Sequence, residues 1–312
     1  MKKFLLYITY FLIPLVMFAI VFELNARSIP NTYKFKDTRM KEIGASLETL
    51  ILGNSLSFHG INPRYFNNAF NLANEGQRLE IDLFLLQKYQ PICHNLRNVI
   101  INISEENLFQ AEYESQKEPT WPVLIYYGIY MSYPKHGMFS EFNYELTIPK
   151  HAFLKIKEWY MSKISHTPFD LKCDSLGWND SRENMRKRDT RKMNEKFFKI
   201  KTTTGRKFDY LRYENNKNYL DKIIQYCKSH QLMLIVIRTP LYQGFINSQI
   251  KEKTFLINSL GDDLKKNKSV LYKDYSNDSR LSSNIDLFFD GIHLAPQGAS
   301  IFSKLLKEDF NL

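Results

Sequence analysis

Cysteine is scarce in this sequence of 312 residues, which contains only Cys93, Cys173 and Cys227. Three scattered thiols are too few for a disulfide framework, and the odd count leaves at least one of them unpaired within a monomer. We expect them to be buried as small apolar side chains. The sequence also lacks histidines at metal-ligand spacing from cysteine or acidic partners, so we predict no metal site and no cofactor.

Acidic residues are in the minority, with 33 Asp and Glu against 43 Lys and Arg, which gives a net charge of +10. This excess favours anionic partners, and we expect phospholipid headgroups or acidic glycans rather than nucleic acid. Residues 182–207 are strongly basic and carry apolar residues at spacings that could form one edge of a helix. A solvated cationic helix is the simpler interpretation of this segment, and a polyanion-binding face is the alternative.

A long uncharged run, residues 4–22, follows two lysines at the N-terminus. Its length is close to the roughly 20 residues that span a hydrocarbon core. A cleaved signal peptide is the alternative, but the run is longer than a usual apolar region of that kind, and residues 23–27 offer no convincing cleavage site. We therefore predict a membrane anchor at residues 1–25 and a linker at residues 26–45. The two lysines favour a cytoplasmic N-terminus, with the remaining chain outside the membrane.

From residue 46 onward, short β-rich runs alternate with helical periodicity, which is typical of a parallel sheet covered on both faces. Five strands are predicted, at residues 49–52, 69–72, 98–103, 233–238 and 270–275. Covering helices are predicted at residues 79–89, 216–229 and 251–264, with a last helix from Pro296. Residues 107–215 do not fit the alternation, so we predict an insertion within one α/β domain at residues 46–312.

Two short motifs place a serine, a carboxylate and a histidine beside this sheet. Ser55 follows the first strand, whereas Asp290 and His293 fall between the fifth strand and the last helix. In an open doubly wound sheet the ligand lies beyond the carboxyl ends of the strands, so we expect the three residues to converge. Serine is a poor nucleophile unless an imidazole takes its proton and a carboxylate orients that imidazole. The spacing of three residues lets one turn present Asp290 to one ring nitrogen of His293 while the other faces Ser55.

Together, Gly-Asn-Ser-Leu at residues 53–56 and Asp-Gly-Ile-His at residues 290–293 resemble the first and last blocks of the SGNH (GDSL-type) hydrolase superfamily. Residues 70–77, Phe-Asn-Leu-Ala-Asn-Glu-Gly-Gln, look like its second block, in which a glycine amide helps to form the oxyanion hole. The third block, Gly-x-Asn-Asp, is not recognisable in residues 102–107.

This resemblance implies a flavodoxin-like α/β/α sandwich with Ser55, Asp290 and His293 as catalytic residues. The oxyanion donors would be the backbone amides of Ser55 and Gly76 together with the side chain of Asn74. Because the third block is missing, either Asn74 or Ser104 must supply the donor that it normally provides, or the reaction is slow.

The predicted anchor and the resemblance together imply an extracytoplasmic serine esterase or O-acyltransferase. It is similar to the branch of the superfamily that adds or removes acyl groups, commonly acetyl, on cell-envelope or exported polysaccharides. Such a polysaccharide and the membrane are the expected partners, and a multi-span membrane acyltransferase is a further candidate. The alternative is a catalytically weak glycan-binding or assembly module that works beside such an acyltransferase. The missing third block favours this alternative, and the intact set of serine, histidine and aspartate argues against it.

Several other residues have competing interpretations. His59 could act as a base, but we expect it to point away from the site or to line its entrance. Glu105 and Glu106 could act as acid and base, although a solvated loop is the simpler account. Asp274 is expected to support the loop that carries Asp290. The insertion is aromatic, and a packed aromatic core is a simpler interpretation than stacking on sugar rings. Its aromatic residues are Trp121, Tyr126, Tyr127, Tyr130, Tyr133, Phe139, Phe142 and Tyr144.

Overall fold

The computed structural model describes residues 1–109, 121–134, 144–179, 209–246 and 249–312. The chain divides into two compact units. The first contains Met1–Thr38 and Tyr113–Leu171, and the second contains Arg39–Glu112 and Lys172–Leu312. The predicted boundaries of the anchor, linker and insertion stay predictions. The basic segment at residues 182–207 lies outside the described residues.

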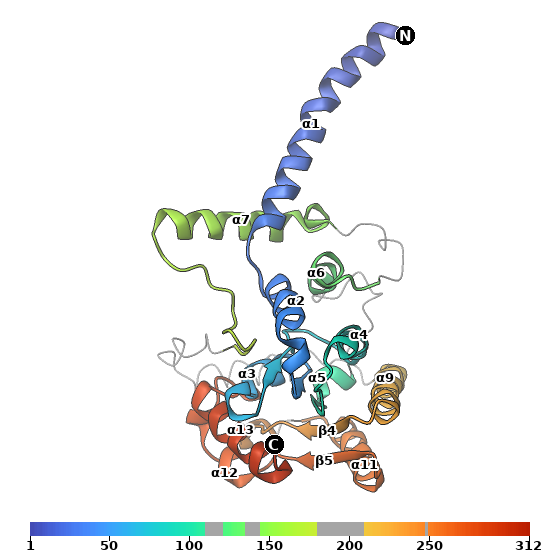
Figure 1. Ribbon diagram of the computed structural model, residues 1–312, viewed down its shortest axis with the longest axis vertical. Helices are drawn as coiled ribbons and strands as arrows, with labels where there is room; N and C mark the ends of the chain where they lie inside the picture. Colours follow the sequence, from blue (N-terminus) through green and yellow to red (C-terminus); the bar gives the residue numbers. More distant parts are fainter. Residues whose placement is uncertain (110–120, 135–143, 180–208, 247–248) are drawn as a thin grey trace. The chain divides into compact units, whose positions relative to one another are not determined.

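The second unit is built on a five-stranded, all-parallel sheet with the strand order β2-β1-β3-β4-β5 (Figure 1). The strands are β1 (Thr49–Ile51), β2 (Ala69–Asn71), β3 (Asn98–Asn102), β4 (Met233–Arg238) and β5 (Val270–Asp274). All five predicted strands are confirmed, with bounds that differ by at most one residue at the carboxyl end. The chain turns from β1 to one side and from β3 to the other, so the switch point of the sheet lies between these two strands.

Helices cover both faces of this sheet, which confirms the predicted α/β architecture. Figure 1 shows α3 (Ser55–Gly60) and α13 (Pro296–Phe310) on one side of the sheet, and α4 (Leu79–Tyr89), α9 (Tyr210–Ser229) and α11 (Lys251–Lys266) on the other. Phe302 and Leu306 of α13 share a buried cluster with isoleucines of β1, β3 and β4. The inner strands are apolar on both faces because helices exclude water from both. Short segments complete the unit: η1 (Gly44–Ser46), η2 (Pro63–Tyr65), η3 (Gln90–Ile92), α5 (Glu105–Leu108), α10 (Gln243–Ile246), α12 (Ser279–Ser282) and η6 (Ile285–Leu287).

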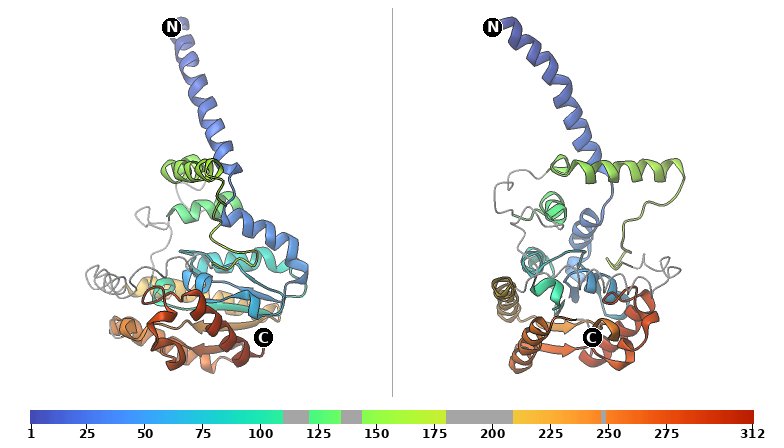
Figure 2. Two further views of the ribbon diagram at one scale, coloured as in Figure 1. Left: turned by 90° about the vertical axis from the view of Figure 1, so that its left-hand side faces the viewer. Right: turned by 180° about the vertical axis from the view of Figure 1, so that it is seen from behind.

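The first unit begins with the predicted apolar helix, α1 (Lys2–Ser28). Its mean hydropathy reaches 2.5 over 18 residues that are wholly unburied, so it is long and apolar enough to cross a membrane. A signal sequence would have the same features. The unit also contains α6 (Trp121–Met131), η4 (Glu145–Thr147) and α7 (Pro149–Ile164). Figure 2 shows that α7 runs across the end of α1 rather than along it. A further helix, α2 (Thr32–Ile43), occupies much of the segment predicted as a linker.

Described aromatic residues of the predicted insertion pack against one another and against α2. Tyr127 is fully buried, and its ring meets the edge of Tyr33 at 5.0 Å between centroids. Tyr126 stacks on the same tyrosine at 5.3 Å. These contacts favour the interpretation as an aromatic core. Phe139 and Phe142 lie outside the described residues.

The three cysteines form no disulfide. Cys93 and Cys227 are buried, as expected from the composition, whereas Cys173 is partly exposed. Burial raises the pKa of Cys93 to about 11 and that of Cys227 to about 12, so both thiols stay protonated at neutral pH.

Candidate active site

Ser55 is held at the start of a short helix by the sharp turn that follows β1. Gly53 has a φ of +121°, and a Cβ on it would lie 2.1 Å from Oδ1 of Asn102, so only glycine fits there. Asn54 then caps α3, because its Oδ1 accepts the N–H of Leu56 at 3.0 Å. This turn places the Ser55 hydroxyl at the carboxyl edge of the sheet, beside the switch point.

Asp290 and His293 belong to a tight loop between η6 and α13. Oδ1 of Asp290 accepts the backbone N–H of Ile292 at 2.9 Å and that of His293 at 2.8 Å. Oδ2 of Asp290 lies 2.8 Å from Nδ1 of His293, and Nε2 of His293 lies 2.8 Å from Oγ of Ser55. One carboxylate oxygen of Asp290 therefore fixes the backbone of the loop, and the other orients the imidazole of His293. The three residues that the sequence places far apart are brought into one hydrogen-bonded chain.

The charge state of Asp290 determines the direction of these hydrogen bonds. Burial alone would raise the pKa of Asp290, but the His293 ring and the two backbone N–H donors outweigh it and hold the pKa well below its usual range. An ionised carboxylate has no proton to donate, so Nδ1 of a neutral His293 must carry the hydrogen. Nε2 is then the acceptor for the hydroxyl proton of Ser55. This is the arrangement that general-base activation of a serine requires.

Asn74 lies beside the serine turn and has an unused donor. Its backbone N–H donates to the carbonyl of Gly53 at 3.2 Å, and its side chain is 4% exposed. Within the part of the chain that the structure describes, its buried Nδ2 has no hydrogen-bond partner. Gly76 follows in the same turn with a φ of +68°. A buried N–H group without a partner is rare in proteins and suggests a group that binds a ligand.

Ser104, the other candidate for the missing donor, is already engaged. It caps α5, where its Oγ accepts the N–H of Asn107 at 3.4 Å and donates to Oδ1 of the same residue at 3.3 Å. The same Oγ also accepts from Nδ2 of Asn54 at 3.4 Å. Of the two candidates that the sequence left open, only Asn74 has a donor to spare.

Two buried residues that the sequence analysis missed support the serine turn. Asn102, the last residue of β3, accepts the hydroxyl of Ser57 at 2.7 Å and donates to Oδ1 of Asn54 at 3.2 Å. Asp82 of α4 is fully buried, and its Oδ1 accepts the N–H of Gly53 at 2.9 Å and the side-chain amide of Gln77 at 2.6 Å. Burial raises the pKa of Asp82 to about 7, against the opposing effect of these two hydrogen bonds.

The remaining predicted residues are placed as follows. His59 is 2% exposed, and its ring meets that of His293 edge to face at 5.6 Å, so it lies against the base rather than pointing away. Glu105 and Glu106 lie in the first turn of α5, not in a solvated loop. Asp274 pairs with Arg238 of β4 at 2.7 Å. The described ranges contain no group of three or more histidine, cysteine or acidic side chains that could hold a metal ion.

Comparison with known proteins adds little to this geometry. No family model and no curated protein matches the sequence. Among solved structures, the chain is similar to the crystal structure of a presumed acylhydrolase from Bacteroides fragilis. The two chains share 12% sequence identity with a TM-score of 0.40, and the match covers 85% of this chain and 86% of the other. At this identity and TM-score, the similarity indicates nothing about the reaction.

Proposed function

We propose that the protein is an SGNH-type serine hydrolase or O-acyltransferase that acts on carboxylic esters. The observation that carries the proposal is the continuous chain from Ser55 Oγ to His293 Nε2 and from His293 Nδ1 to Asp290 Oδ2, with 2.8 Å at both contacts. Neither contact requires any side-chain movement to begin the reaction. A purely structural site has no need for a nucleophile, a base and an orienting carboxylate in this order.

The reaction follows from the direction of the hydrogen bonds. Ser55 Oγ attacks the ester carbonyl while its proton passes to Nε2 of His293, and Asp290 stabilises the imidazolium that forms. The tetrahedral intermediate collapses, and His293 returns the proton to the departing alcohol, which leaves an acyl group on Ser55. Water or a sugar hydroxyl then gives its proton to His293 and attacks the acyl carbon. His293 returns this proton to Ser55 Oγ as the bond between serine and the acyl carbon breaks, which releases a free acid in the first case and a new ester in the second.

Negative charge on the carbonyl oxygen must be stabilised during both steps. The backbone amides of Ser55 and Gly76 are the proposed donors, and the side chain of Asn74 is the third. The buried and unpartnered Nδ2 of Asn74 supports this role, because a donor fixed in advance and shielded from water stabilises an oxyanion most effectively. Ser104 is not proposed as a donor, since its hydroxyl is used in capping α5.

We propose a cell-surface or exported polysaccharide as the substrate, with acetyl as the acyl group. The apolar helix α1 supports a single-pass membrane location, and an extracytoplasmic site follows from the lysines that precede it. A multi-span membrane acyltransferase is the proposed donor of acyl groups if the protein transfers rather than hydrolyses. The alternative of a catalytically weak binding module has less support than it had from the sequence, because the buried Nδ2 of Asn74 could replace the missing third-block donor.

The test uses the full chain in detergent with a fluorophosphonate probe and a small activated acetate ester. Ser55→Ala should abolish both labelling and ester cleavage, and His293→Ala should lower cleavage by about 10²–10⁴-fold. Ser283→Ala and His230→Ala, which change exposed residues of the same types, serve as controls and should behave as the unmodified protein. Labelling that persists in Ser55→Ala would mean that another residue is the nucleophile.

A further inference from the structure

Helix α7 exposes large apolar side chains along one side. Phe153 is 59% exposed, Leu154 43%, Met161 53% and Ile164 72%. The last three lie one, eight and eleven residues after Phe153, so the four positions are on the same side of a helix with 3.6 residues per turn. A soluble surface rarely presents such a row, and a contiguous exposed apolar face indicates a protein or membrane contact.

Lysines are interleaved with this apolar row. Lys150 and Lys157 are exposed on the same side of α7, and Lys163 is exposed near its end. A lysine can lay its aliphatic stem along an apolar surface while its ammonium group reaches polar surroundings. In a helix that lies in the headgroup region of an anionic bilayer, apolar side chains meet the acyl boundary and the ammonium groups of lysines reach the headgroups.

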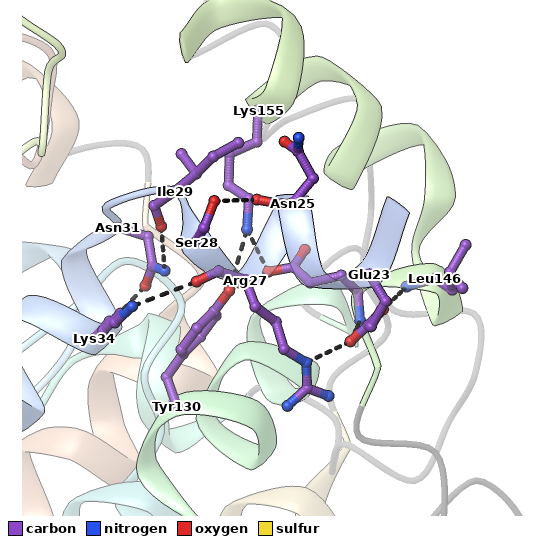
Figure 3. Close-up of polar contacts among 11 residues, drawn as sticks. Glu23, Asn25, Arg27, Ser28, Ile29, Asn31, Lys34, Tyr130, Leu146 and Lys155 are labelled. Carbon is purple, nitrogen blue, oxygen red and sulfur yellow. Dashed lines mark hydrogen bonds and ion pairs between the residues drawn. The ribbon is translucent and has the colours of Figure 1, made fainter. Parts of the chain in front are cut away.

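The opposite side of α7 is fixed by a buried polar cluster (Figure 3). Lys155 forms an ion pair with Glu145, which is fully buried, and its ammonium also donates to the hydroxyl of Tyr130 at 3.2 Å. Tyr130, from α6, donates to the same carboxylate. Because a buried ion pair is costly to break, this cluster determines which side of α7 faces inward. The apolar row is therefore held outward.

The same cluster joins α7 to the end of the apolar helix. The carboxylate of Glu23, in α1, accepts the backbone N–H of Glu145 at 3.1 Å and that of Leu146 at 3.0 Å. Asn25 of α1 also donates to the hydroxyl of Tyr160, in α7, at 3.0 Å. The segment η4, which directly precedes α7, and Tyr160 in the last part of α7 are thus both attached to the last turns of α1.

The attachment point coincides with the end of the apolar run. Side chains of α1 from Phe4 to Phe22 are exposed or partly exposed, and the first buried one is Glu23. At 1.5 Å per residue, the helix between these two positions is roughly 29 Å long, close to the thickness of a hydrocarbon core. If Lys2 and Lys3 lie at one surface of the bilayer, Glu23 lies at the other. The helix attached there, α7, runs across α1 and so along the membrane plane (Figure 2).

We propose that α7 lies in the headgroup region of the bilayer that α1 crosses, with its apolar outer face on the acyl boundary and its lysines on anionic headgroups. The proposal rests on the membrane location proposed above, but it does not depend on the esterase activity. The outer face of α7 then contacts lipid rather than a partner protein. The lysines within the row favour lipid, because the core of a protein interface is depleted in lysine. An interfacial α7 would hold the C-terminal end of α1 at a constant depth in the bilayer.

The experiment places an environment-sensitive fluorophore on single cysteines of the full chain, with Cys173 replaced by serine and the two buried cysteines retained. Ile164→Cys reports on the apolar row, and His151→Cys is the matched control, because His151 is exposed but lies on the other side of α7. The chain is reconstituted in phosphatidylcholine vesicles, with and without phosphatidylglycerol and with and without brominated acyl chains.

The emission of the fluorophore at position 164 should shift to the blue and be quenched by the brominated lipid. The fluorophore at position 151 should show neither effect. Phosphatidylglycerol should strengthen the quenching, and Lys150→Gln with Lys157→Gln should remove that dependence. A chain that floats with the vesicles but has water-like emission at position 164 overturns the proposal, as does a shift that appears only when a partner protein is added. A chain that does not float overturns both the anchor and the interfacial helix, while Ser55 labelling reports separately on the esterase.

Discussion

Asp82 should make the stability of this protein depend on pH near neutrality. Burial raises the pKa of this carboxyl group from 3.8 to about 7, which means that the folded protein favours the neutral acid. The folded-state pKa lies above the unfolded one, so the stabilising contribution is fully present below pH 3.8 and is lost as the pH rises through about 7. The shift corresponds to about three pKa units, or roughly 4 kcal/mol between the two limits.

Asp82→Asn is the informative variant, because an amide mimics the neutral acid. Its carbonyl oxygen can accept the N–H of Gly53 and the amide of Gln77, as Oδ1 does in the native protein. Below pH 4 the variant and the native protein should be about equally stable. Above pH 7 the variant should be the more stable by up to roughly 4 kcal/mol, since it avoids a buried charge.

Denaturant unfolding of the full chain in one detergent, followed between pH 4 and 8.5, measures this difference. Asp82→Ala is the control for the hydrogen bonds, because it removes the acceptor of Gly53 and should be destabilised at every pH. Ester cleavage by Asp82→Asn should be retained, since the turn that carries Ser55 is kept. A native protein that is more stable than Asp82→Asn at pH 8 would refute the reasoning, because it would mean that the charged carboxylate is the form the fold prefers.

Two further predictions concern the proposed reaction. Asp290→Asn should preserve folding yet lower turnover by up to roughly 10⁴-fold, since the amide favours the wrong imidazole tautomer; ester cleavage and thermal unfolding measure the two effects, and unchanged turnover would remove Asp290 from the mechanism. Asn74→Ala should lower kcat by about 10²–10³-fold with little change in KM, because the lost donor acts mainly in the transition state. Its stability should not fall, since the buried Nδ2 has no partner to lose among the residues that the structure describes; a loss of stability with unchanged kcat would assign Asn74 a structural role.

The sheet could be predicted because each strand is a short apolar run that is recognisable from neighbouring residues alone, and the runs alternate with helical periodicity. The inner strands β3 and β4 contain short apolar runs, and β4 was predicted with both of its ends. The convergence of Ser55 with His293 also followed from the sequence, because parallel strands bring their carboxyl ends to one edge. Helix α7 and its outer face could not be predicted, since its apolar spacing has meaning only once the buried Lys155 identifies the inner side.

Asp82 was missed for a different reason. The helix at residues 79–89 was predicted from its apolar residues, but Asp82 is one of its fully buried positions, whereas Leu83 is partly exposed. Asp82 follows Leu79 by three positions, so the carboxylate lies on the inner face of the helix. An acidic residue on the inner, apolar face of a predicted helix was the feature of the sequence that could have identified Asp82. The sequence could not show its partner, because Gly53 lies 29 residues away and reaches Asp82 only when α4 packs beside β1.

If the protein is an SGNH-type enzyme as proposed, its missing third block requires the oxyanion donor to come from another position of the fold. Asn102 ends β3 at the edge where that block would begin, but its side chain is used to hold Asn54 and Ser57. Ser104 is used in its own helix cap. Both side chains thus fix the turn around the nucleophile, so neither can hydrogen-bond to the oxygen of a reacting carbonyl. In the turn after β2, Asn74 is held by the hydrogen bonds of its backbone. Among the described residues, its side-chain amide has no partner and can still donate to that oxygen. We infer that Asn102 and Ser104, at the end of β3, keep the turn around Ser55 rigid, and that Asn74, after β2, binds the oxyanion.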